Sequence, residues 1–96
     1  MKELKIVATI ILKPEYKDEV LKALHNVVDA TRKEEGNVSY DLHQSTSESL
    51  SYTILEVWKS EEAIAIHNAS THFGEFKKAI DGKISDLQIA IIKQVY

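Results

Sequence analysis

The sequence predicts an α+β fold with the order β-α-β-β-α-β, in which an antiparallel sheet carries its helices on one face. Two observations predict it. Apolar, β-branched runs alternate with segments of helical periodicity, and a short polar link joins the second strand to the third. The chain has 96 residues, which is the usual size of one domain, so we expect residues 1–96 to form a single domain.

The first strand is predicted over residues 4–12, where leucine, isoleucine and valine form a run typical of a strand buried on both faces. Pro14 suits the first turn of a helix, because its missing N–H has no partner there in any case. Apolar residues at three- and four-residue spacing then predict a helix of about 18–20 residues. We expect Gly36 to be the residue that ends this helix.

The middle of the chain predicts a hairpin. Val38, Tyr40 and Leu42 alternate with polar residues, which indicates a second strand, and residues 50–58 indicate a third. The polar turn over residues 45–49 is short, so the two strands are expected to pair in antiparallel fashion.

The last part predicts two helices and a strand. Ser60 is a suitable N-cap for a short helix that ends near residue 68 or 69. Ser70 or Thr71 caps the next helix, Gly82 ends it, and its inner face carries Phe73, Phe76 and Ile80. Residues 86–96 are apolar on both sides and are predicted to form the last strand.

The first and last strands are predicted to be apolar on both faces, yet the helices of one chain can cover only one. A second copy of the chain would cover the other face with its own sheet. We therefore expect a homodimer. The alternative, an uncovered apolar face, would be a liability for aggregation.

Composition excludes several functions. The chain has 12 basic and 15 acidic residues and a net charge of -3, which argues against a nucleic-acid partner because phosphate contacts need clustered lysine and arginine. There is no cysteine, so disulfides, thiol nucleophiles and cysteine-bound zinc are excluded. No signal peptide and no apolar stretch of about 20 residues is present, which predicts a cytoplasmic protein without a membrane partner.

Two histidines are the candidate catalytic residues. His67 follows Ile64 by three positions in the short helix and is expected to face the sheet. His72 lies in the first turn of the next helix, where the helix dipole disfavours a positive charge. A neutral imidazole can act as a general base near pH 7. His25 and His43 are expected at the surface, with the dimer rim as a second location for His43.

Aromatic and acidic residues are the candidate substrate-binding residues. Glu56 and Trp58 share one face of the third strand, where Glu56 is expected to hydrogen-bond a backbone group or orient a histidine. Trp58 would either fill the core or stack on a planar substrate and offer its N–H. The other candidates are expected either to pack across strands and in the core or to line the pocket. They are Tyr40, Tyr52, Phe73 and Phe76.

No metal site is expected. Two histidines and Glu56 have suitable donor atoms, but His67 and His72 are five residues apart across a helix break rather than one turn apart on one helix.

An ordered series of short segments resembles a known family. Lys-Glu-Glu-Gly-Asn over residues 33–37 precedes the strand with Tyr40, Glu-Val-Trp-Lys-Ser follows over 56–60, and His67 lies four residues after Ala63. Thr-His-Phe completes the series over 71–73. Across essentially the whole chain this resembles the antibiotic-biosynthesis-monooxygenase family, particularly its small quinol-monooxygenase-like bacterial members. The resemblance implies a dimeric α+β barrel with a pocket in each subunit.

The resemblance also implies an activity, the oxidation of quinol-like or phenolic molecules by dioxygen with no metal, flavin or haem. The aromatic anion can give dioxygen one electron directly, so the protein must supply a dry pocket, a base and hydrogen-bond donors. One alternative is isomerisation of a phosphorylated autoinducer-type sugar derivative, with Lys77 and Lys78 as candidates for the phosphate. Another is a non-catalytic dimer that binds a small molecule. Haem binding fits poorly, because the first strand has no asparagine and residues 75–79 have no histidine.

Overall fold

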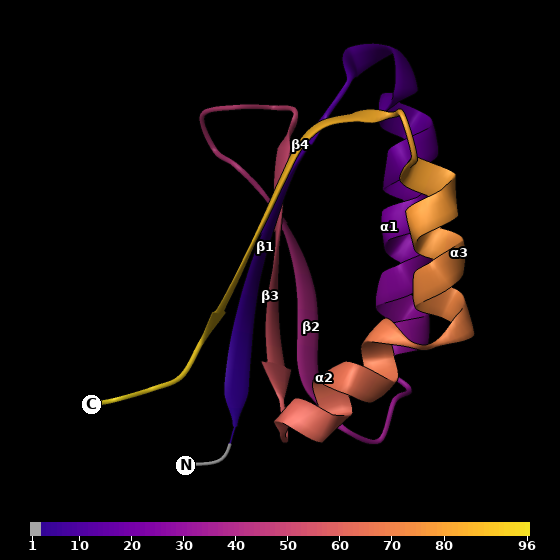
Figure 1. Ribbon diagram of the computed structural model, residues 1–96. Helices are drawn as coiled ribbons and strands as arrows, with labels where there is room; N and C mark the ends of the chain where they lie inside the picture. The colour runs from indigo at the N-terminus through magenta and orange to yellow at the C-terminus, as the bar shows by residue number, and fades with distance from the viewer. Residues whose placement is uncertain (1–2) are drawn as a thin grey trace.

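The computed structural model describes residues 3–96, with the elements in the predicted order. Figure 1 shows the helices on one side of the sheet, as expected. Within the described residues, no helix is both long and apolar enough to cross a membrane. The elements are β1 (Leu4–Leu12), the 3₁₀ turn η1 (Pro14–Tyr16), α1 (Lys17–Thr31), β2 (Asn37–Gln44), β3 (Ser51–Trp58), α2 (Glu61–Asn68), α3 (Thr71–Ile80) and β4 (Ile84–Ile92).

The sheet has the strand order β2-β3-β1-β4, and each neighbouring pair is antiparallel. This is the ferredoxin-like arrangement that the sequence predicts. The short β2–β3 turn forms the expected hairpin, and the two helical connections cross over one face of the sheet (Figure 1).

The core lies between the sheet and the helices. The even-numbered residues of β1 and β3 face the helices, because successive side chains of a strand alternate between its faces. Ile10, Leu12 and Ile54 of these strands are almost fully buried, and so are Val20 and Leu24 of α1. The period-two and period-3.6 patterns in the sequence therefore fix which residues of β1, β3 and α1 meet.

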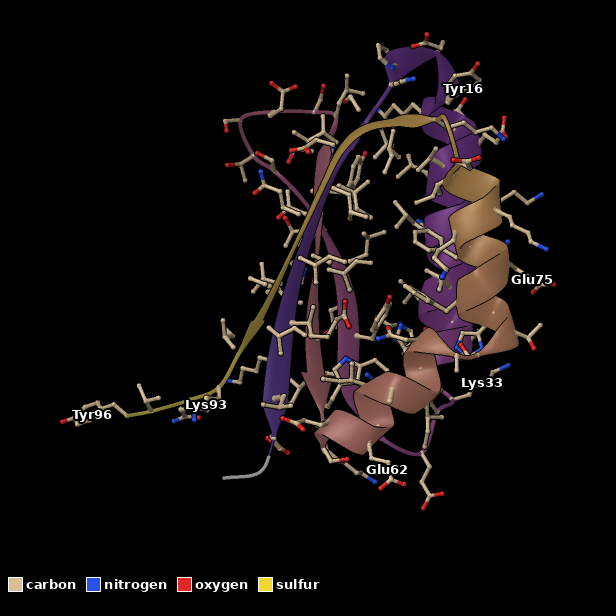
Figure 2. All side chains as sticks on the ribbon, viewed as in Figure 1. Tyr16, Lys33, Glu62, Glu75, Lys93 and Tyr96 are labelled. Carbon is tan, nitrogen blue, oxygen red and sulfur yellow. The ribbon has the colours of Figure 1, made fainter. Side chains whose placement is uncertain are left out.

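The last strand is shorter than predicted. It covers Ile84–Ile92 and not residues 86–96, because it pairs only with β1. Lys5 pairs with Ile92 near the start of β1, so the chain beyond has no strand to pair with. Figure 2 shows Lys93 and Tyr96 extending away from the sheet.

We had expected Gly36 to end α1, but it does not. The helix ends at Thr31, and among the described residues Gly82 is the glycine with a positive φ, 75°. An added Cβ at Gly36 would lie 2.4 Å from the Cβ of Ala63. Position 36 therefore has no room for a side chain, because the α1–β2 loop lies directly against α2. Gly82 follows the end of α3, as predicted.

The apolar residues of β4 divide between the two faces. Ile92 lies on the open face with Leu55 of β3, and these side chains are 48% and 45% exposed. Leu87, Ile89 and Ile91 are 45%, 57% and 58% exposed although they lie on the helix side, opposite β1 residues that face the core. The partner's sheet expected on the open face would cover only part of these residues, because the helices do not reach over the β4 edge.

Candidate active site

An apolar cavity of about 430 Å³ lies between the sheet and helices α2 and α3. Its walls come from the inner faces of all four strands, with Tyr40 contributed by β2, and from the two helices. Five of its lining residues carry polar or charged groups: Tyr40, Glu56, His67, Asn68 and Lys77. We refer to it as the sheet-side cavity.

Two helix caps position His67 in its wall. The Ser60 hydroxyl accepts a hydrogen bond from the Ala63 backbone N–H at 3.1 Å and begins α2 as predicted. The Ser70 hydroxyl accepts from the Phe73 N–H at 3.3 Å to begin α3, and donates to the His67 carbonyl at 2.6 Å. This serine fixes the corner between the helices, and the His67 side chain is turned inward and buried.

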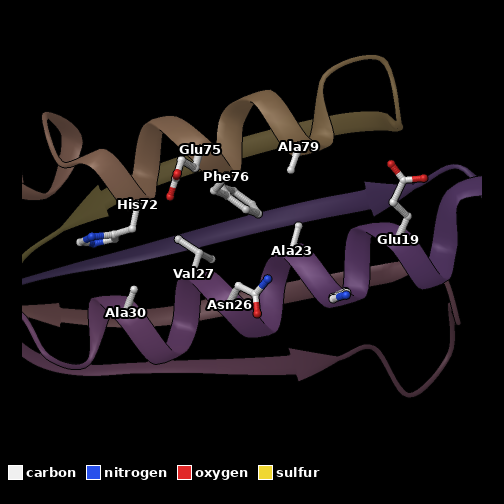
Figure 3. A pocket seen from close by; sticks show the side chains of 10 residues that line it. Glu19, Ala23, Asn26, Val27, Ala30, His72, Glu75, Phe76 and Ala79 are labelled. Carbon is white, nitrogen blue, oxygen red and sulfur yellow. The ribbon is translucent and has the colours of Figure 1, made fainter.

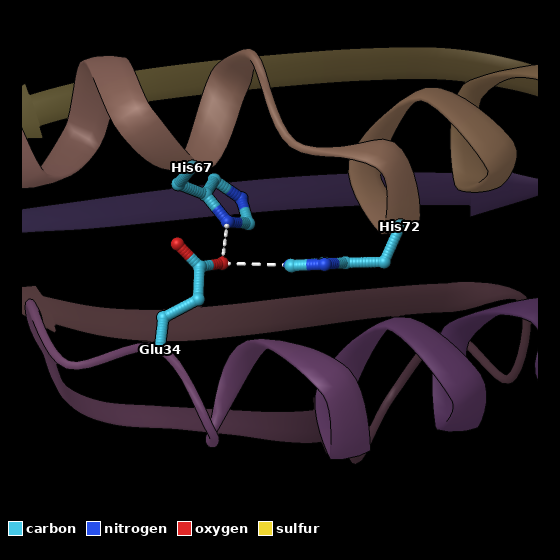
Figure 4. A group of neighbouring side chains, drawn as sticks. All are labelled: Glu34, His67 and His72. Atoms are coloured by element: carbon cyan, nitrogen blue, oxygen red, sulfur yellow. Dashed lines mark hydrogen bonds and ion pairs between the residues drawn. The ribbon is translucent and has the colours of Figure 1, made fainter.

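Glu34 joins the two candidate histidines. Its Oε2 lies 2.7 Å from Nδ1 of His67 and 2.7 Å from Nε2 of His72 (Figure 4). The side chains are 3% exposed for His67, 12% for Glu34 and 26% for His72. An ionised carboxylate can only accept hydrogen bonds, so both nitrogens donate their N–H to it. This assigns His67 the tautomer with its proton on Nδ1, which leaves Nε2 unprotonated in the neutral ring.

Aromatic rings enclose the His67 imidazole. Its centroid is 4.6 Å from that of Trp58, 4.6 Å from that of Phe73 and 5.7 Å from that of Tyr40. Burial lowers the pKa of His67 below its ordinary value of 6.5, although the hydrogen bond to Glu34 acts in the opposite direction. The imidazole is therefore neutral at pH 7, the state that a general base requires.

Glu56 does not orient a histidine, which corrects that part of the expectation. Its Oε1 accepts a hydrogen bond from Nε1 of Trp58 at 2.8 Å. Burial raises the pKa of Glu56 to about 7, while the Trp58 hydrogen bond works against the rise. Glu34 takes the place that the sequence suggested for Glu56, and Glu56 lines the cavity as an acid that is about half protonated near pH 7.

Trp58 fills the core and is not a cavity wall. Its side chain is 0% exposed, its N–H is bound to Glu56, and its ring meets that of Tyr40 edge-on with centroids 6.3 Å apart. Of the two expected roles, core packing and stacking on a substrate, the structure shows core packing. Trp58 also holds the Glu56 carboxyl by a hydrogen bond and packs against the His67 ring.

The aromatic candidates separate into two groups. Tyr40, Phe73 and Phe76 line the sheet-side cavity. Burial, and then the nearby Glu56 carboxylate, raises the pKa of Tyr40, so its phenol stays a neutral donor. Tyr52 does not line the cavity, because it pairs with Gln44 toward the other end of the hairpin, and its hydroxyl accepts from the Gln44 amide at 3.1 Å.

His72 does not line the sheet-side cavity with His67. It borders a second cavity of about 440 Å³, the α1/α3 groove, to which Val27 and Ala30 contribute from α1 (Figure 3). The sequence therefore identified two histidines of one hydrogen-bonded group, but the structure directs them toward different cavities. His25 and His43 are exposed, as expected.

Glu34, His67 and His72 could also hold a divalent cation, since one donor atom from each lies within 4.8 Å of the others. Two imidazoles and one carboxylate are donors that zinc and ferrous iron accept. The set differs from the one weighed in the sequence, which had Glu56 as its carboxylate. A cation bound between these atoms would replace both hydrogen bonds to Oε2.

Two residues of the site, Glu34 and Asn68, were not singled out in the sequence, whereas Lys77 was considered there for a phosphate. Glu34 belongs to the Glu-Glu-Gly-Asn run, but a loop position has no periodicity that would show what it faces. Asn68 lines the cavity from the end of α2. Lys77 lines it too, with its Nζ 5.4 Å from the Phe73 ring centroid, whereas Lys78 does not.

The fold and the cavity define the class of the protein: a ferredoxin-like α+β domain with an apolar, histidine-lined cavity between sheet and helices. Comparison with known sequences then gives the family. The sequence profile of the antibiotic biosynthesis monooxygenase family matches residues 4–79. The chain belongs to this family, as the ordered segments in its sequence suggested.

Individual relatives agree. The chain is 41% identical over 69 residues to the protein named "Putative monooxygenase YcnE" of Bacillus subtilis (strain 168), covering 72% of this chain and 73% of that protein. A crystal structure of an antibiotic biosynthesis monooxygenase superposes with a TM-score of 0.91 at 29% identity, covering 97% of this chain and 99% of the other. A conserved protein from Methanosarcina mazei Go1 superposes with a TM-score of 0.93 at 28% identity, covering 99% and 95%.

Proposed function

We propose that the protein is a monooxygenase that oxidises a quinol-like or phenolic small molecule with dioxygen and without a metal, flavin or haem. The observation that carries the proposal is the His67 imidazole, buried in an apolar cavity with Nδ1 bound to Glu34. Family membership supports the reaction type, and the cavity's aromatic lining suits a planar substrate.

In this oxidation, the step that a side chain must carry out is removal of a proton from the substrate. Nε2 of His67 takes the proton of a substrate hydroxyl, and the anion passes one electron to dioxygen. The resulting radical and superoxide combine at a ring carbon that carries a hydrogen, and the peroxide anion takes the proton back from Nε2 of His67 to form a hydroperoxide. Loss of water leaves a carbonyl that holds one oxygen atom of the dioxygen, while the other atom leaves in the water.

Two further groups of the cavity can hold the substrate anion. Tyr40 stays protonated and can donate its O–H, because burial raises its pKa. Glu56 donates in the fraction that is protonated near pH 7. Donors fixed in an apolar cavity stabilise developing charge more strongly than water does. The Trp58 N–H is already bound to Glu56, so we assign it no contact with the substrate.

We also propose that the functional unit is a homodimer in which open sheet faces pack together. Leu55 and Ile92 support this, since both are nearly half exposed on that face. Val57 lies beside them on the same face of β3. A cytoplasmic location and a single domain over residues 1–96 complete the proposal.

Oxygen uptake by metal-stripped protein tests the activity, with a panel of hydroquinones and naphthohydroquinones as substrates. We expect uptake above spontaneous autoxidation, and a loss of about 100-fold or more in kcat for His67→Ala, because positioned bases contribute this much. His25→Ala is the matched control, since His25 is exposed on α1. Full activity in the His67 variant would refute the assignment of the base.

An isomerase reaction on a phosphorylated sugar derivative is the second candidate. Lys77 favours it, because this lysine lines the cavity and offers a cation for an anionic group. Turnover of such a phosphate ester without oxygen consumption, lost in Lys77→Met and retained in Lys78→Met, would support this reaction. Binding of aromatic ligands without turnover of either substrate would favour a binding protein.

A further inference from the structure

Three metal-donor atoms meet where the α1–β2 loop lies against the corner between α2 and α3. Glu34 offers Oε2 from the loop, His67 offers Nδ1 from the last turn of α2, and His72 offers Nε2 from the first turn of α3 (Figure 4). One donor atom of each residue lies within 4.8 Å of the others. The fold therefore brings together, at one point, two imidazoles and a carboxylate that are far apart in the sequence.

The donor types determine the kind of ion that fits. Imidazole nitrogen and carboxylate oxygen are ligands of zinc and its neighbours in the first transition row, whereas calcium and magnesium take oxygen ligands. Ligand atoms about 2.0–2.2 Å from a tetrahedral zinc ion lie about 3.4 Å from one another. The two O–N separations at Glu34 are 2.7 Å, so they must open by about 0.7 Å to admit the ion.

The surroundings fix one ligand and leave another within reach of water. The His67 side chain is 3% exposed, and its ring centroid lies 4.6 Å from those of Trp58 and Phe73, so the direction of its Nδ1 is set by packing. The His72 side chain is 26% exposed and borders the α1/α3 groove. An ion can therefore enter from this groove, and a water molecule can supply the fourth ligand there.

We propose that Glu34, His67 and His72 bind one divalent transition-metal ion, zinc in preference to calcium or magnesium, and that the bound ion inhibits the proposed oxidation. The ion takes the place of the two N–H groups that now point at Glu34. Each ring stays neutral and carries its single proton on its other nitrogen. Nε2 of His67 then holds a proton and cannot accept one from the substrate. The binding site depends on the geometry alone, whereas the inhibition rests on the proposed function.

Cobalt(II) tests the site without any turnover, because its visible absorption is much stronger in a four-coordinate site than in the octahedral ion in water. Tag-free protein, stripped with a chelator and dialysed, is titrated with the ion. We expect the absorption to saturate at one ion per chain, to disappear as zinc displaces the cobalt, and to be unaffected by calcium or magnesium. Wild-type protein that leaves the cobalt spectrum octahedral would overturn the site, and this measurement needs no variant to fold.

His72→Gln tests which residues are the ligands, since it removes one donor and leaves the lining of the sheet-side cavity intact. Its affinity for zinc, measured by isothermal titration calorimetry, should be about 100-fold or more below that of the wild-type protein, because even groups that only support a ligand contribute about 10–100-fold. His25→Gln is the matched control, an exposed histidine of α1 that should leave the affinity unchanged. An unchanged affinity in a folded His72→Gln protein would refute the ligand set.

Oxygen uptake then tests the inhibition. Saturating zinc should lower hydroquinone turnover by the wild-type protein about 100-fold, the loss expected for a missing base, and an excess of chelator should restore it. At the same zinc concentration, His72→Gln should keep its own zinc-free rate. Undiminished turnover by zinc-loaded wild-type protein would refute the inhibition. If the wild-type protein consumes no oxygen at all, the proposed function fails, while the cobalt titration still decides the metal site.

Discussion

Glu56 is the buried carboxyl whose ionisation should weigh most on the stability of the fold. It is 6% exposed and accepts one hydrogen bond, and burial raises its pKa from 4.5 to about 7. A carboxyl with a raised pKa in the folded state contributes its full stability below pH 4.5 and loses it as the pH rises through 7. At about 1.4 kcal/mol for each tenfold change in acidity, the loss reaches about 3 kcal/mol by pH 8.

The perturbation is Glu56→Gln, which removes the ionisation and keeps an oxygen that can accept the Trp58 N–H. We expect the variant to be more stable than the wild-type protein by roughly 3 kcal/mol at pH 8 and by much less near pH 5. Urea unfolding at several pH values measures the difference, at one protein concentration because a dimer's stability depends on it. Glu48→Gln is the control, since Glu48 is exposed in the β2–β3 turn.

A difference between Glu56→Gln and wild type that stays constant across this pH range would refute the reasoning. It would mean that Glu56 ionises as easily in the folded chain as in the unfolded one. A difference that shrinks as the pH rises would mean that the protein stabilises the charged form, for which Lys77 of the same cavity is the available cation.

The remaining predictions concern packing and assembly. Gly36→Ala should lower the free energy of unfolding by about 1–3 kcal/mol through overpacking, because the new Cβ would meet that of Ala63 at 2.4 Å. Ala63→Gly in the same chain should restore part of the loss, and a purely additive double variant would contradict the contact. Leu55→Lys should shift the protein from dimer to monomer in analytical ultracentrifugation, while Ile66→Lys, on the exposed side of α2, should not. A Leu55→Lys protein that stays dimeric would refute the open sheet face as the interface.

The fold was largely predictable because its main signals are local. Alternating apolar residues gave the buried face of β3, and serine caps gave the starts of α2 and α3. The errors were at positions that depend on distant parts of the chain. β4 ends where its partner β1 begins, although Val95 continues the apolar pattern. Gly36 resembles a helix-ending glycine in the sequence, but its size is set by Ala63 on another element.

The site was predictable in its residue types and less so in its pairings. His67 faces the cavity as its spacing from Ile64 indicated, and Glu56 lies on the inner face of β3. Which carboxylate meets the histidines depends on how the α1–β2 loop lies against the α2–α3 corner. No periodicity encodes that contact, so Glu34 could be placed only by the tertiary structure.

Glu34 and Glu56 have different partners and different environments, and this difference has a chemical consequence. Burial keeps the His67 imidazole neutral while its Nδ1 is bound to Glu34, and Glu56 lines the same cavity with a pKa of about 7. A neutral imidazole and a protonated carboxyl in one cavity can take a proton from one atom of a ligand and return a proton to another. Such a pair would serve oxygenation of a phenol and isomerisation through an enediol equally well, and both reactions would show a similar bell-shaped pH profile. The oxygen consumed per molecule of product is therefore the quantity that separates the two reactions.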